Sequence, residues 1–306
     1  KGLCYHDISF GNVFFDAKSG EVLICDNDNV CVEGETEVSV LGTPDFMAPE
    51  LVRGEARPSI FTDLYSLSVL LFYLFYIHHP LFGARVLNIQ CLDLTARTQL
   101  CGQNPLFIFD PHDTSNQAMP ISEDATGESG ANALAFGSIY PQFLKDYFLK
   151  AFTMGLNSPE KRVRESEWRA VMIQLRDSIF KCPRCQAENF YDIEKLKGTK
   201  GVPDPCWSCY ASLQLPSRIR FGRDIVMLNV GTHLYPHHID PNKLYHFSKP
   251  VATVTSALTL KNVSHKSWHV IYPDGTKADI LPNQEIPLTG GSKIHFGDIE
   301  GEIRGS

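Results

Sequence analysis

A carboxylate and an amide near the start of the chain have a spacing that chemistry could use. In YHDISFGNVFFD, residues 5–16, Asp7 precedes Asn12 by five positions, and an apolar run follows. A second apolar run, EVLIC, ends directly before Asp26. Because DAKSG between the two runs is a turn sequence, we expect a pair of strands that holds Asn12 and Asp26 side by side. Taken alone, Asp7 and Asn12 are more often turn residues before a strand than a catalytic pair.

Four cysteines form the pattern C-x2-C-x20-C-x2-C, at Cys182, Cys185, Cys206 and Cys209. This spacing is typical of a zinc site, in which each C-x2-C turn gives two thiolates to one tetrahedral ion. Because four cysteines saturate the ion, we expect one structural Zn²⁺ rather than a catalytic one. The region resembles a zinc ribbon. Disulfides and a redox pair are the alternatives, and a reducing compartment disfavours both.

The five other cysteines are scattered among apolar neighbours, and we interpret them as reduced thiols in or near the core. They are Cys4, Cys25, Cys31, Cys91 and Cys101. The total of nine is odd, and the first residues, KGLCYHD, lack the apolar region of a secretion signal. Both features predict a reducing, intracellular setting, and we expect a cytoplasmic protein.

Composition excludes several classes of protein. The 306 residues carry 28 basic and 35 acidic side chains, for a net charge of −7, which argues against general nucleic-acid binding. Seven basic residues near the cysteine pattern are more often a solvated face than a nucleic-acid site; they are Lys181, Arg184, Lys195, Lys197, Lys200, Arg218 and Arg220. The apolar run Leu64–Ile77 has 14 residues, too few for the roughly 20 of a membrane-spanning helix, so we expect a buried helix.

The chain divides by pattern into three predicted domains of a multidomain α+β protein. Residues 1–177 contain the short strand runs and then helical patterns, with a long loop expected at 102–139. Residues 178–215 hold the predicted zinc ribbon. From residue 216 to 306 the helical period disappears, and short β-rich runs separated by turn sequences predict an all-β sandwich.

Several motifs in the first 177 residues resemble the catalytic half of a bacterial-type Ser/Thr protein kinase. The family pattern H-R-D-L-x-x-x-N, D-F-G and A-P-E corresponds here to Tyr5-His6-Asp7 with Asn12, Asp26-Asn27-Asp28 and Ala48-Pro49-Glu50. GTPDFMAPE is similar to the segment that closes many kinase activation loops, and TDLYSL, which contains Asp63, is similar to the start of the central helix. The order of these landmarks also matches the family.

The resemblance implies phosphoryl transfer from ATP, which depends on positioning and charge neutralisation. Asp7 would accept the proton of a protein hydroxyl. Asn12 and Asp26 would bind the Mg²⁺ that bridges the ATP phosphates. The resemblance also implies an ion pair between Glu50 and a late arginine, Arg162, which we expect to be bidentate and largely buried.

Three departures from the family pattern affect the expected function. His6 replaces the arginine that would contact an activation-loop phosphate, and Asn27-Asp28 replace Phe-Gly. Ser9 replaces the lysine that contacts the γ-phosphate, so the rate or the substrate class is expected to differ. The Gly-rich loop and the ATP-contacting lysine of the family precede the catalytic loop. We therefore expect the chain to be a kinase C-lobe without its N-lobe, inactive by itself.

The end of the chain resembles the last strands of a forkhead-associated domain. The matching pieces are Asn262-Val263-Ser264, Asp274-Gly275, Pro282 to Leu288, Gly290-Gly291 and Ile294-His295-Phe296-Gly297. Such domains bind phosphothreonine peptides through an arginine, a serine and an asparagine. The arginine could come from Phe221-Gly222-Arg223 or the loop could instead be Tyr235-Pro236-His237-His238, while Lys266 or Ser267 stands near the expected asparagine. A structural or docking sandwich is therefore the preferred interpretation over a phosphothreonine reader.

We therefore expect a protein kinase that acts on protein hydroxyls with ATP and Mg²⁺, followed by a zinc ribbon and a forkhead-associated-like domain. The main alternative is a kinase-derived scaffold that binds partners or phosphopeptides and has little catalytic activity. A small-molecule phosphotransferase is a third interpretation, since Ser9 in place of lysine occurs in that wider group. GTPDFMAPE argues against it, because that segment shapes a groove for peptide substrates.

Overall fold

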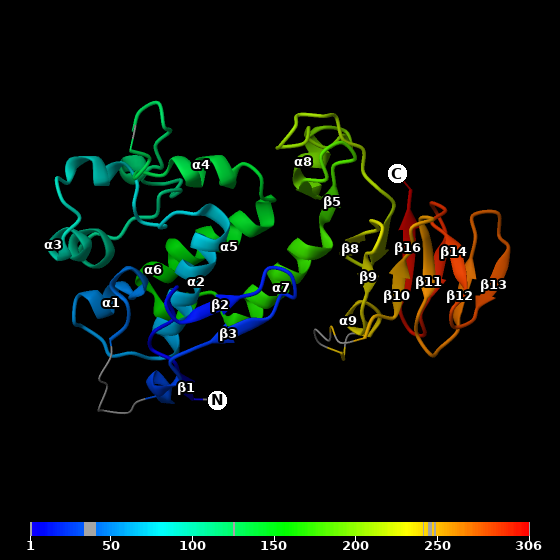
Figure 1. Cartoon of the computed structure of the whole chain (residues 1–306), viewed down its shortest axis with the longest axis horizontal. Coiled ribbons are helices and arrows are strands. Elements are labelled where there is room, and N and C mark those ends of the chain that lie inside the picture. The colour runs from blue at the N-terminus through cyan, green and yellow to red at the C-terminus, as the bar shows by residue number, and fades with distance from the viewer. Residues whose placement is uncertain are drawn as a thin grey trace. The chain divides into compact units, whose positions relative to one another are not determined.

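The chain forms two compact units. The computed structural model describes residues 2–33, 41–124, 126–240, 242–243, 247 and 249–305. The units are Lys1–Ala170 and Val171–Ser306, and the boundary between them falls inside helix α7, Glu165–Asp177 (Figure 1). The predicted zinc region and the predicted sandwich therefore belong to the same compact unit.

The first unit is mainly helical, with two short antiparallel strand pairs near its start. Strand β1 (Leu3–Cys4) pairs with β4 (Cys31–Val32), and β2 (Val13–Phe15) pairs with β3 (Val22–Ile24). The α-helices are α1 (Pro49–Val52), α2 (Ile60–Tyr76), α3 (Leu94–Thr98), α4 (Ala131–Gly137), α5 (Gln142–Phe152), α6 (Met154–Asn157) and the start of α7. Single turns of other helix types lie at η1 (Asn27–Asn29), η2 (Pro44–Phe46), η3 (Ala84–Asn88), η4 (Gln99–Gln103), η5 (Thr114–Asn116) and η6 (Pro159–Lys161).

Helix α2 is the centre of the first unit, as its apolar sequence predicts. It begins at Ile60, earlier than expected, because Ser59 forms a capping box: its hydroxyl accepts from the Thr62 N–H. Phe72 lies at the middle of an aromatic cluster, stacked on Tyr76 at 4.3 Å and edge-on to Phe148 of α5 at 5.2 Å. In the described part of the chain, no helix combines the length and the apolar character needed to cross a bilayer.

The loop that the sequence predicts at 102–139 is more ordered than expected. It contains η5 and the helix α4, which contacts α2. The Asp124 carboxylate accepts hydrogen bonds from the backbone and hydroxyl groups of Thr126 and Ser129, which fix the turn before α4. The Gly-rich and Ser-rich composition hid this helix because the hydrogen bonds of Asp124 in the preceding turn, rather than an apolar period, organise the segment.

The second unit contains a small cysteine-bearing region and an antiparallel β-sandwich. The cysteine region has a hairpin of β5 (Ile179–Lys181) and β6 (Glu188–Phe190), followed by helix α8 (Ile193–Gly198). The remaining elements are β7 (Arg218–Phe221), β8 (Asp224–Met227), β9 (His233–Leu234), α9 (Pro236–Ile239), β10 (Ala252–Val254), β11 (Thr259–Asn262), β12 (Trp268–Ile271), β13 (Lys277–Ile280), β14 (Glu285–Pro287), β15 (Lys293–His295) and β16 (Glu300–Arg304).

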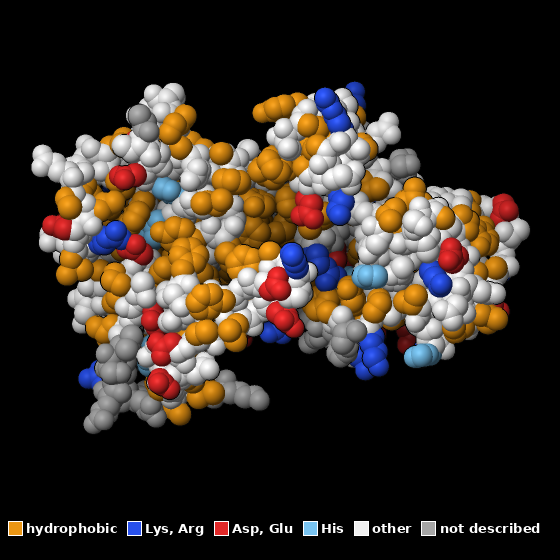
Figure 2. Space-filling view, viewed as in Figure 1, with side chains coloured by type: hydrophobic (Ala, Val, Ile, Leu, Met, Phe, Trp, Pro, Cys, Tyr) orange, Lys and Arg blue, Asp and Glu red, His pale blue; other side chains and the backbone are white. Residues whose placement is uncertain are grey.

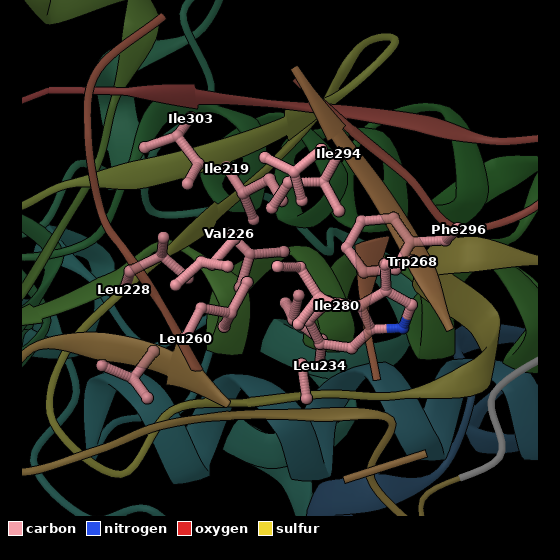
Figure 3. Packing of buried hydrophobic residues seen from close by; sticks show 14 of the residues in the cluster. Ile219, Val226, Leu228, Leu234, Leu260, Trp268, Ile280, Ile294, Phe296 and Ile303 are labelled. Carbon is pink, nitrogen blue, oxygen red and sulfur yellow. The ribbon is translucent and has the colours of Figure 1, made fainter. Parts of the chain in front are cut away.

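The sandwich has a six-stranded sheet with the order β13-β12-β15-β16-β7-β8 and a four-stranded sheet with the order β14-β11-β10-β9. Residues of both sheets alternate into one core, as the sequence alternation predicts. Figure 3 shows Trp268 and Ile294 of the larger sheet in the same interior as Leu234 and Leu260 of the smaller one. From β7 onward the described elements are strands apart from the short helix α9.

Strand β8 is shared by two cores. Val226 lies in the sandwich core, whereas its neighbours Ile225 and Met227 pack against Phe180 and the cysteines Cys182 and Cys206. Successive side chains of a strand point to opposite faces, so β8 is covered on both sides. The cysteine region and the sandwich are therefore joined by packing as well as by the chain.

A buried ion pair ties distant parts of the first unit together. The guanidinium of Arg162 makes two parallel hydrogen bonds of 2.8 Å to the two carboxylate oxygens of Glu50. The Arg162 side chain is 1% exposed and that of Glu50 is 14% exposed. Arg162 also donates to the backbone oxygens of Gly155 and Phe61, so four of its five N–H groups have partners. The bidentate, largely buried contact expected from the sequence is thus present.

We predict that Arg162→Ala destabilises the first unit by about 3–5 kcal/mol, because it leaves the Glu50 carboxylate without its buried partner. Chemical denaturation monitored by the fluorescence of Trp168, which lies in this unit, would measure the change. Glu50→Ala should have a similar effect. Glu55→Ala is the matched control, since Glu55 pairs with Arg53 at an exposed position and should cost less than about 1 kcal/mol. Equal small losses in Arg162→Ala and the control would contradict the assignment.

Candidate active site and cysteine cluster

Asp7 and Asn12, five residues apart, are in direct contact. The Asn12 amide nitrogen donates to the Asp7 side-chain oxygen Oδ2 at 2.9 Å and to the Asp7 backbone oxygen at 3.0 Å. The backbone N–H of Asn12 also donates to the backbone oxygen of Ser9, and this bond closes the turn from Ser9 to Asn12. Because Nδ2 of Asn12 faces Asp7, its Oδ1 faces elsewhere and can serve as a ligand.

Thr43 holds the other oxygen of Asp7. Its N–H and its hydroxyl both donate to Oδ1 of Asp7, at 3.0 and 2.7 Å. These are hydrogen bonds to an ionised acceptor, which are among the stronger ones in proteins. Sequence reasoning did not single out Thr43, although it lies in the GTPDFMAPE segment that was compared with kinases. Thr43 lies in a segment without apolar periodicity and 36 residues from Asp7, so the sequence around it does not indicate this contact.

The hairpin of β2 and β3 brings Asp26 to the end where Asn12 lies, as expected. Val13 pairs with Ile24, and the Cys25 N–H donates to the Asn12 oxygen at 2.9 Å. Asp26 follows at once, is exposed, and has a positive φ of 56°. One of its carboxylate oxygens accepts from Asn29, which leaves the other for a ligand.

The Tyr5 side chain lies near the start of the hairpin, where the charges of Asp26 and Asp7 both act on it. Its hydroxyl donates to the Cys25 backbone oxygen. Burial, followed by the negative charges of Asp26 and Asp7, raises the pKa of the Tyr5 phenol above its usual value. Asn12 contacts Asp7 directly, and the bond from the Cys25 N–H to the Asn12 backbone oxygen places Asp26 next to Asn12 along the hairpin. The oxygens of these side chains are of the kind that suits a hard cation such as Mg²⁺.

Asp63 anchors the loop to helix α2. Its two carboxylate oxygens accept from the backbone N–H groups of Tyr5, at 2.6 Å, and of His6, at 3.0 Å. His6 has a φ of 70°, a left-handed conformation that is uncommon for a residue with a side chain. Burial raises the pKa of Asp63, and the two backbone donors offset only part of that rise. Asp63 therefore fixes the backbone immediately before Asp7.

Ser9 lies within the same loop but is buried, with 3% of its surface exposed. Asp7 and Asn12 on either side are both partly exposed. The Ser9 hydroxyl is thus less accessible than the two side chains that flank it.

The four cysteines of the C-x2-C pairs converge on one point. The Sγ atoms of Cys182 and Cys209 are 3.6 Å apart, as are those of Cys185 and Cys206. All four Sγ atoms lie within 4.8 Å of one another. A tetrahedral zinc ion with Zn–S bonds of about 2.3 Å requires sulfurs about 3.8 Å apart, whereas a disulfide bond is about 2 Å long. The donor set therefore fits Zn²⁺.

Backbone N–H groups of the two turns favour thiolates. The N–H of Cys185 and then that of Arg184 lower the pKa of Cys182. Burial alone would raise the pKa of Cys206, but the N–H groups of Cys209 and Ser208 outweigh it and lower the pKa to about 6. These turns resemble each other: the residues after each pair, Gln186 and Tyr210, both have positive φ.

The five remaining cysteines differ from one another in burial. Cys4 and Cys101 are buried, as expected of core thiols, and Cys25 and Cys31 are partly exposed. Cys91 is exposed, which corrects the expectation that it lies in or near the core. Its neighbours lie in an irregular segment between η3 and α3, so the apolar composition around it did not indicate a buried strand or helix.

The basic side chains near the cysteine cluster are partly neutralised. Lys195 lies 3.0 Å from Asp204, and Lys197 lies 2.7 Å from Glu194. On the face drawn in Figure 2, basic side chains lie singly or in small groups with acidic ones nearby.

Asn262 and Ser264, which carry part of the resemblance to forkhead-associated domains, are bonded to each other within the sandwich. Asn262 is fully buried and donates to the Lys266 and Ile280 oxygens, and its Oδ1 accepts from the Ser264 hydroxyl at 2.7 Å. His238 is held against Asp177 at 3.0 Å. Arg223 is exposed in the turn between β7 and β8.

We predict that Asp63→Asn destabilises the first unit by about 1–3 kcal/mol, because one oxygen becomes an NH₂ group that faces a backbone donor. Amide hydrogen exchange at Tyr5 and His6 should also become faster. Asp146→Asn, on the exposed face of α5, is the matched control and should change neither quantity. Unchanged exchange at both amides in Asp63→Asn would show that this carboxylate does not anchor the loop.

We predict that the four-cysteine cluster binds one zinc ion, which Cys182→Ser combined with Cys206→Ser removes. Metal analysis of chain purified without chelator would show the loss of one equivalent. Zinc that is retained in full by the double variant would rule out these ligands. Ser208→Ala, between the second pair of cysteines, is the control and should retain the ion.

Comparison with known proteins bears on the first part of the chain. Residues 1–126 match the family model of the protein kinase domain. Among solved structures, the chain is similar to the kinase PK-1 of the Cydia pomonella granulovirus, with 17% sequence identity and a TM-score of 0.28. That alignment covers 35% of this chain and 37% of the viral one, about a third of its length. A TM-score this low does not establish a shared fold. The family match therefore supports a protein kinase domain in the region that contains Asp7, Asn12, Asp26 and Glu50.

Proposed function

We propose that the first unit takes part in transferring the γ-phosphate of ATP to hydroxyl groups of proteins, as a Ser/Thr-type protein kinase does. The observation that carries the proposal is the Asp7 carboxylate, which is fixed at once by Asn12 and by Thr43. A carboxylate oriented in this way is suited to receive a proton from a bound hydroxyl. The family match over residues 1–126 supports the same reaction class.

Asp7 would act as the general base in this reaction. Thr43 occupies two acceptor positions on Oδ1 and Asn12 occupies one on Oδ2. An ionised carboxylate offers about four lone-pair positions, so one remains for the substrate hydroxyl. Because its existing partners are all donors, they hold the Asp7 carboxylate in one orientation, and the carboxylate becomes neutral when it accepts the proton of the hydroxyl.

Asn12 and Asp26 would bind Mg²⁺, with Oδ1 of Asn12 and one Asp26 oxygen as ligands. When bound, the ion supplies charge neutralisation for the phosphates of ATP. The strand pair of β2 and β3 fixes the spacing of these two residues, since Cys25 bonds the Asn12 backbone. Buried Ser9 offers no positive charge to the γ-phosphate. We therefore propose that phosphoryl transfer is slower, or acts on a different class of substrate, than in kinases with lysine at this position.

The apolar surface of the β2–β3 hairpin supports a further part of the proposal. Its strand residues are exposed to an unusual degree for apolar side chains: Phe14 54%, Phe15 61%, Val22 62%, Leu23 64% and Ile24 52%. A two-stranded hairpin is at best marginally stable without packing on another element. We propose that a polypeptide carrying the ATP-binding Gly-rich loop and lysine covers this hairpin, and that phosphoryl transfer needs both parts.

For the second unit we propose a zinc-stabilised docking module with a forkhead-associated-like sandwich. The buried position of Asn262 and its bond with Ser264 support a structural role for both residues over phosphothreonine binding. The alternative function for the whole chain is a scaffold with little catalysis. The two functions differ in a measurable way, because only a kinase would lose phosphoryl transfer when Asp7 is substituted.

We predict that Asp7→Asn lowers Mg²⁺-dependent phosphorylation of protein substrates by about 10²–10⁴-fold, because the general base is removed. The asparagine oxygen can keep the two bonds from Thr43, whereas its NH₂ group faces the Asn12 amide nitrogen and that bond is lost. The assay requires the chain together with an ATP-binding lobe, and radiolabelled ATP with a mixture of Ser/Thr-containing and Tyr-containing peptides. Asp16→Asn, in the turn after β2, is the matched control, because asparagine can also accept from the Lys18 N–H.

Full activity in Asp7→Asn would contradict the catalytic assignment. Absence of Mg²⁺-dependent transfer in the native sequence as well as in the variant would favour the scaffold. Phosphate transfer to small molecules but not to peptides would favour a small-molecule phosphotransferase.

A further inference from the structure

A second group of metal-binding side chains lies beside the loop of Asp7, and the proposed reaction uses none of them. The sulfur of Cys4 is 2.9 Å from Nε2 of His6, and the sulfur of Cys31 is 3.1 Å from the same nitrogen. The two sulfurs are 3.7 Å apart. All three potential ligand atoms lie within 4.8 Å of one another, and Cys4 and His6 are buried.

Backbone structure positions these three side chains. Cys4 in β1 is directly opposite Cys31 in β4, in an antiparallel pair. Opposed residues of such a pair project their side chains on the same face. His6 follows two residues later with a φ of 70°, and Asp63 accepts its N–H. A positive φ in a residue of this kind is strained and persists only where the surroundings fix it.

Ordinary hydrogen bonding does not explain why two sulfurs converge on one nitrogen. A neutral imidazole nitrogen either donates one hydrogen or accepts one through a single lone pair. Nε2 of His6 can therefore pair fully with only one of the two thiols. The Cys31 thiol has two other partners, the Val32 oxygen at 3.4 Å and the Cys4 sulfur at 3.7 Å. Neither contact accounts for its approach to within 3.1 Å of Nε2 of His6.

One cation among the three atoms would accept a lone pair from each of them. Thiolate sulfur and imidazole nitrogen are preferred ligands of Zn²⁺, and three protein ligands with an open fourth position are a common arrangement. The sulfur separation of 3.7 Å is close to the 3.6 Å in the four-cysteine cluster. Tetrahedral zinc needs sulfur and nitrogen about 3.6 Å apart, so the imidazole would withdraw by roughly half an ångström on binding.

We propose that Cys4, His6 and Cys31 bind a second zinc ion, with the fourth position open to solvent. Both thiols lose their protons to solvent when the ion binds. The ion joins strand β1, the residue before Asp7, and strand β4, and thereby fixes the backbone that leads into the catalytic loop. This binding does not depend on phosphoryl transfer and is tested without an activity assay.

The experiment counts zinc in the full chain purified without chelator, by mass spectrometry of the metal. The native sequence should hold two zinc ions per chain, and Cys31→Ser should hold one. Cys25→Ser is the matched control, because Cys25 is partly exposed like Cys31 but lies outside the cluster; it should retain two. Cys182→Ser combined with Cys206→Ser should retain the ion of the new site.

A second measurement on the native sequence keeps the test decisive if a variant fails to fold. Alkylation of each cysteine is followed by peptide mass spectrometry before and after a chelator is added. Cys31 should react at least several-fold faster after chelation because bound zinc protects its thiolate, whereas Cys25 should react at an unchanged rate. One zinc ion per chain with equal Cys31 reactivity in both conditions would overturn the proposal, as would a disulfide between Cys4 and Cys31 in the freshly purified chain.

Discussion

The position of the whole candidate site depends on one carboxylate, that of Asp63. It projects from the first turn of α2, the central helix of the first unit, and accepts two backbone N–H groups in succession. The N–H groups of two consecutive residues can both bond to one carboxylate only in a particular backbone conformation. Here that conformation includes the positive φ of His6. Asp7 follows directly, so the helix core determines where its side chain lies.

Part of this site could be predicted from sequence because the contacts are encoded by short spacing or by motifs. Asp7 and Asn12 lie on one loop, so their contact follows from a five-residue separation. Glu50 and Arg162 are 112 residues apart, and only a family resemblance could connect them. Thr43 and the group of Cys4, His6 and Cys31 were missed because strand register and loop closure bring them together. Neither is visible in local composition, which indicated only scattered apolar thiols.

The elements of the fold that could be predicted are those with an apolar periodicity in the sequence, and the elements without one were missed. The apolar runs predicted α2, α5 and the alternating strands of the sandwich, because burial of one face produces those patterns. The helix α4 was missed, since hydroxyl groups of Thr126 and Ser129 organise its approach through Asp124. The joint core of the cysteine region and the sandwich was also missed, because a four-residue strand such as β8 is too short to reveal that both of its faces are covered.

That doubly covered strand has a consequence for how such proteins can be recombined in evolution or by engineering. If the cysteine region were deleted or exchanged for another module, Ile225 and Met227 would face water in a strand that the sandwich still needs for Val226. A graft of the sandwich alone would thus carry an apolar edge strand, the feature by which isolated sheets associate with one another. A fragment transferred to another protein should therefore contain the cysteine region and the sandwich together. The boundary of such a fragment would lie before Phe180.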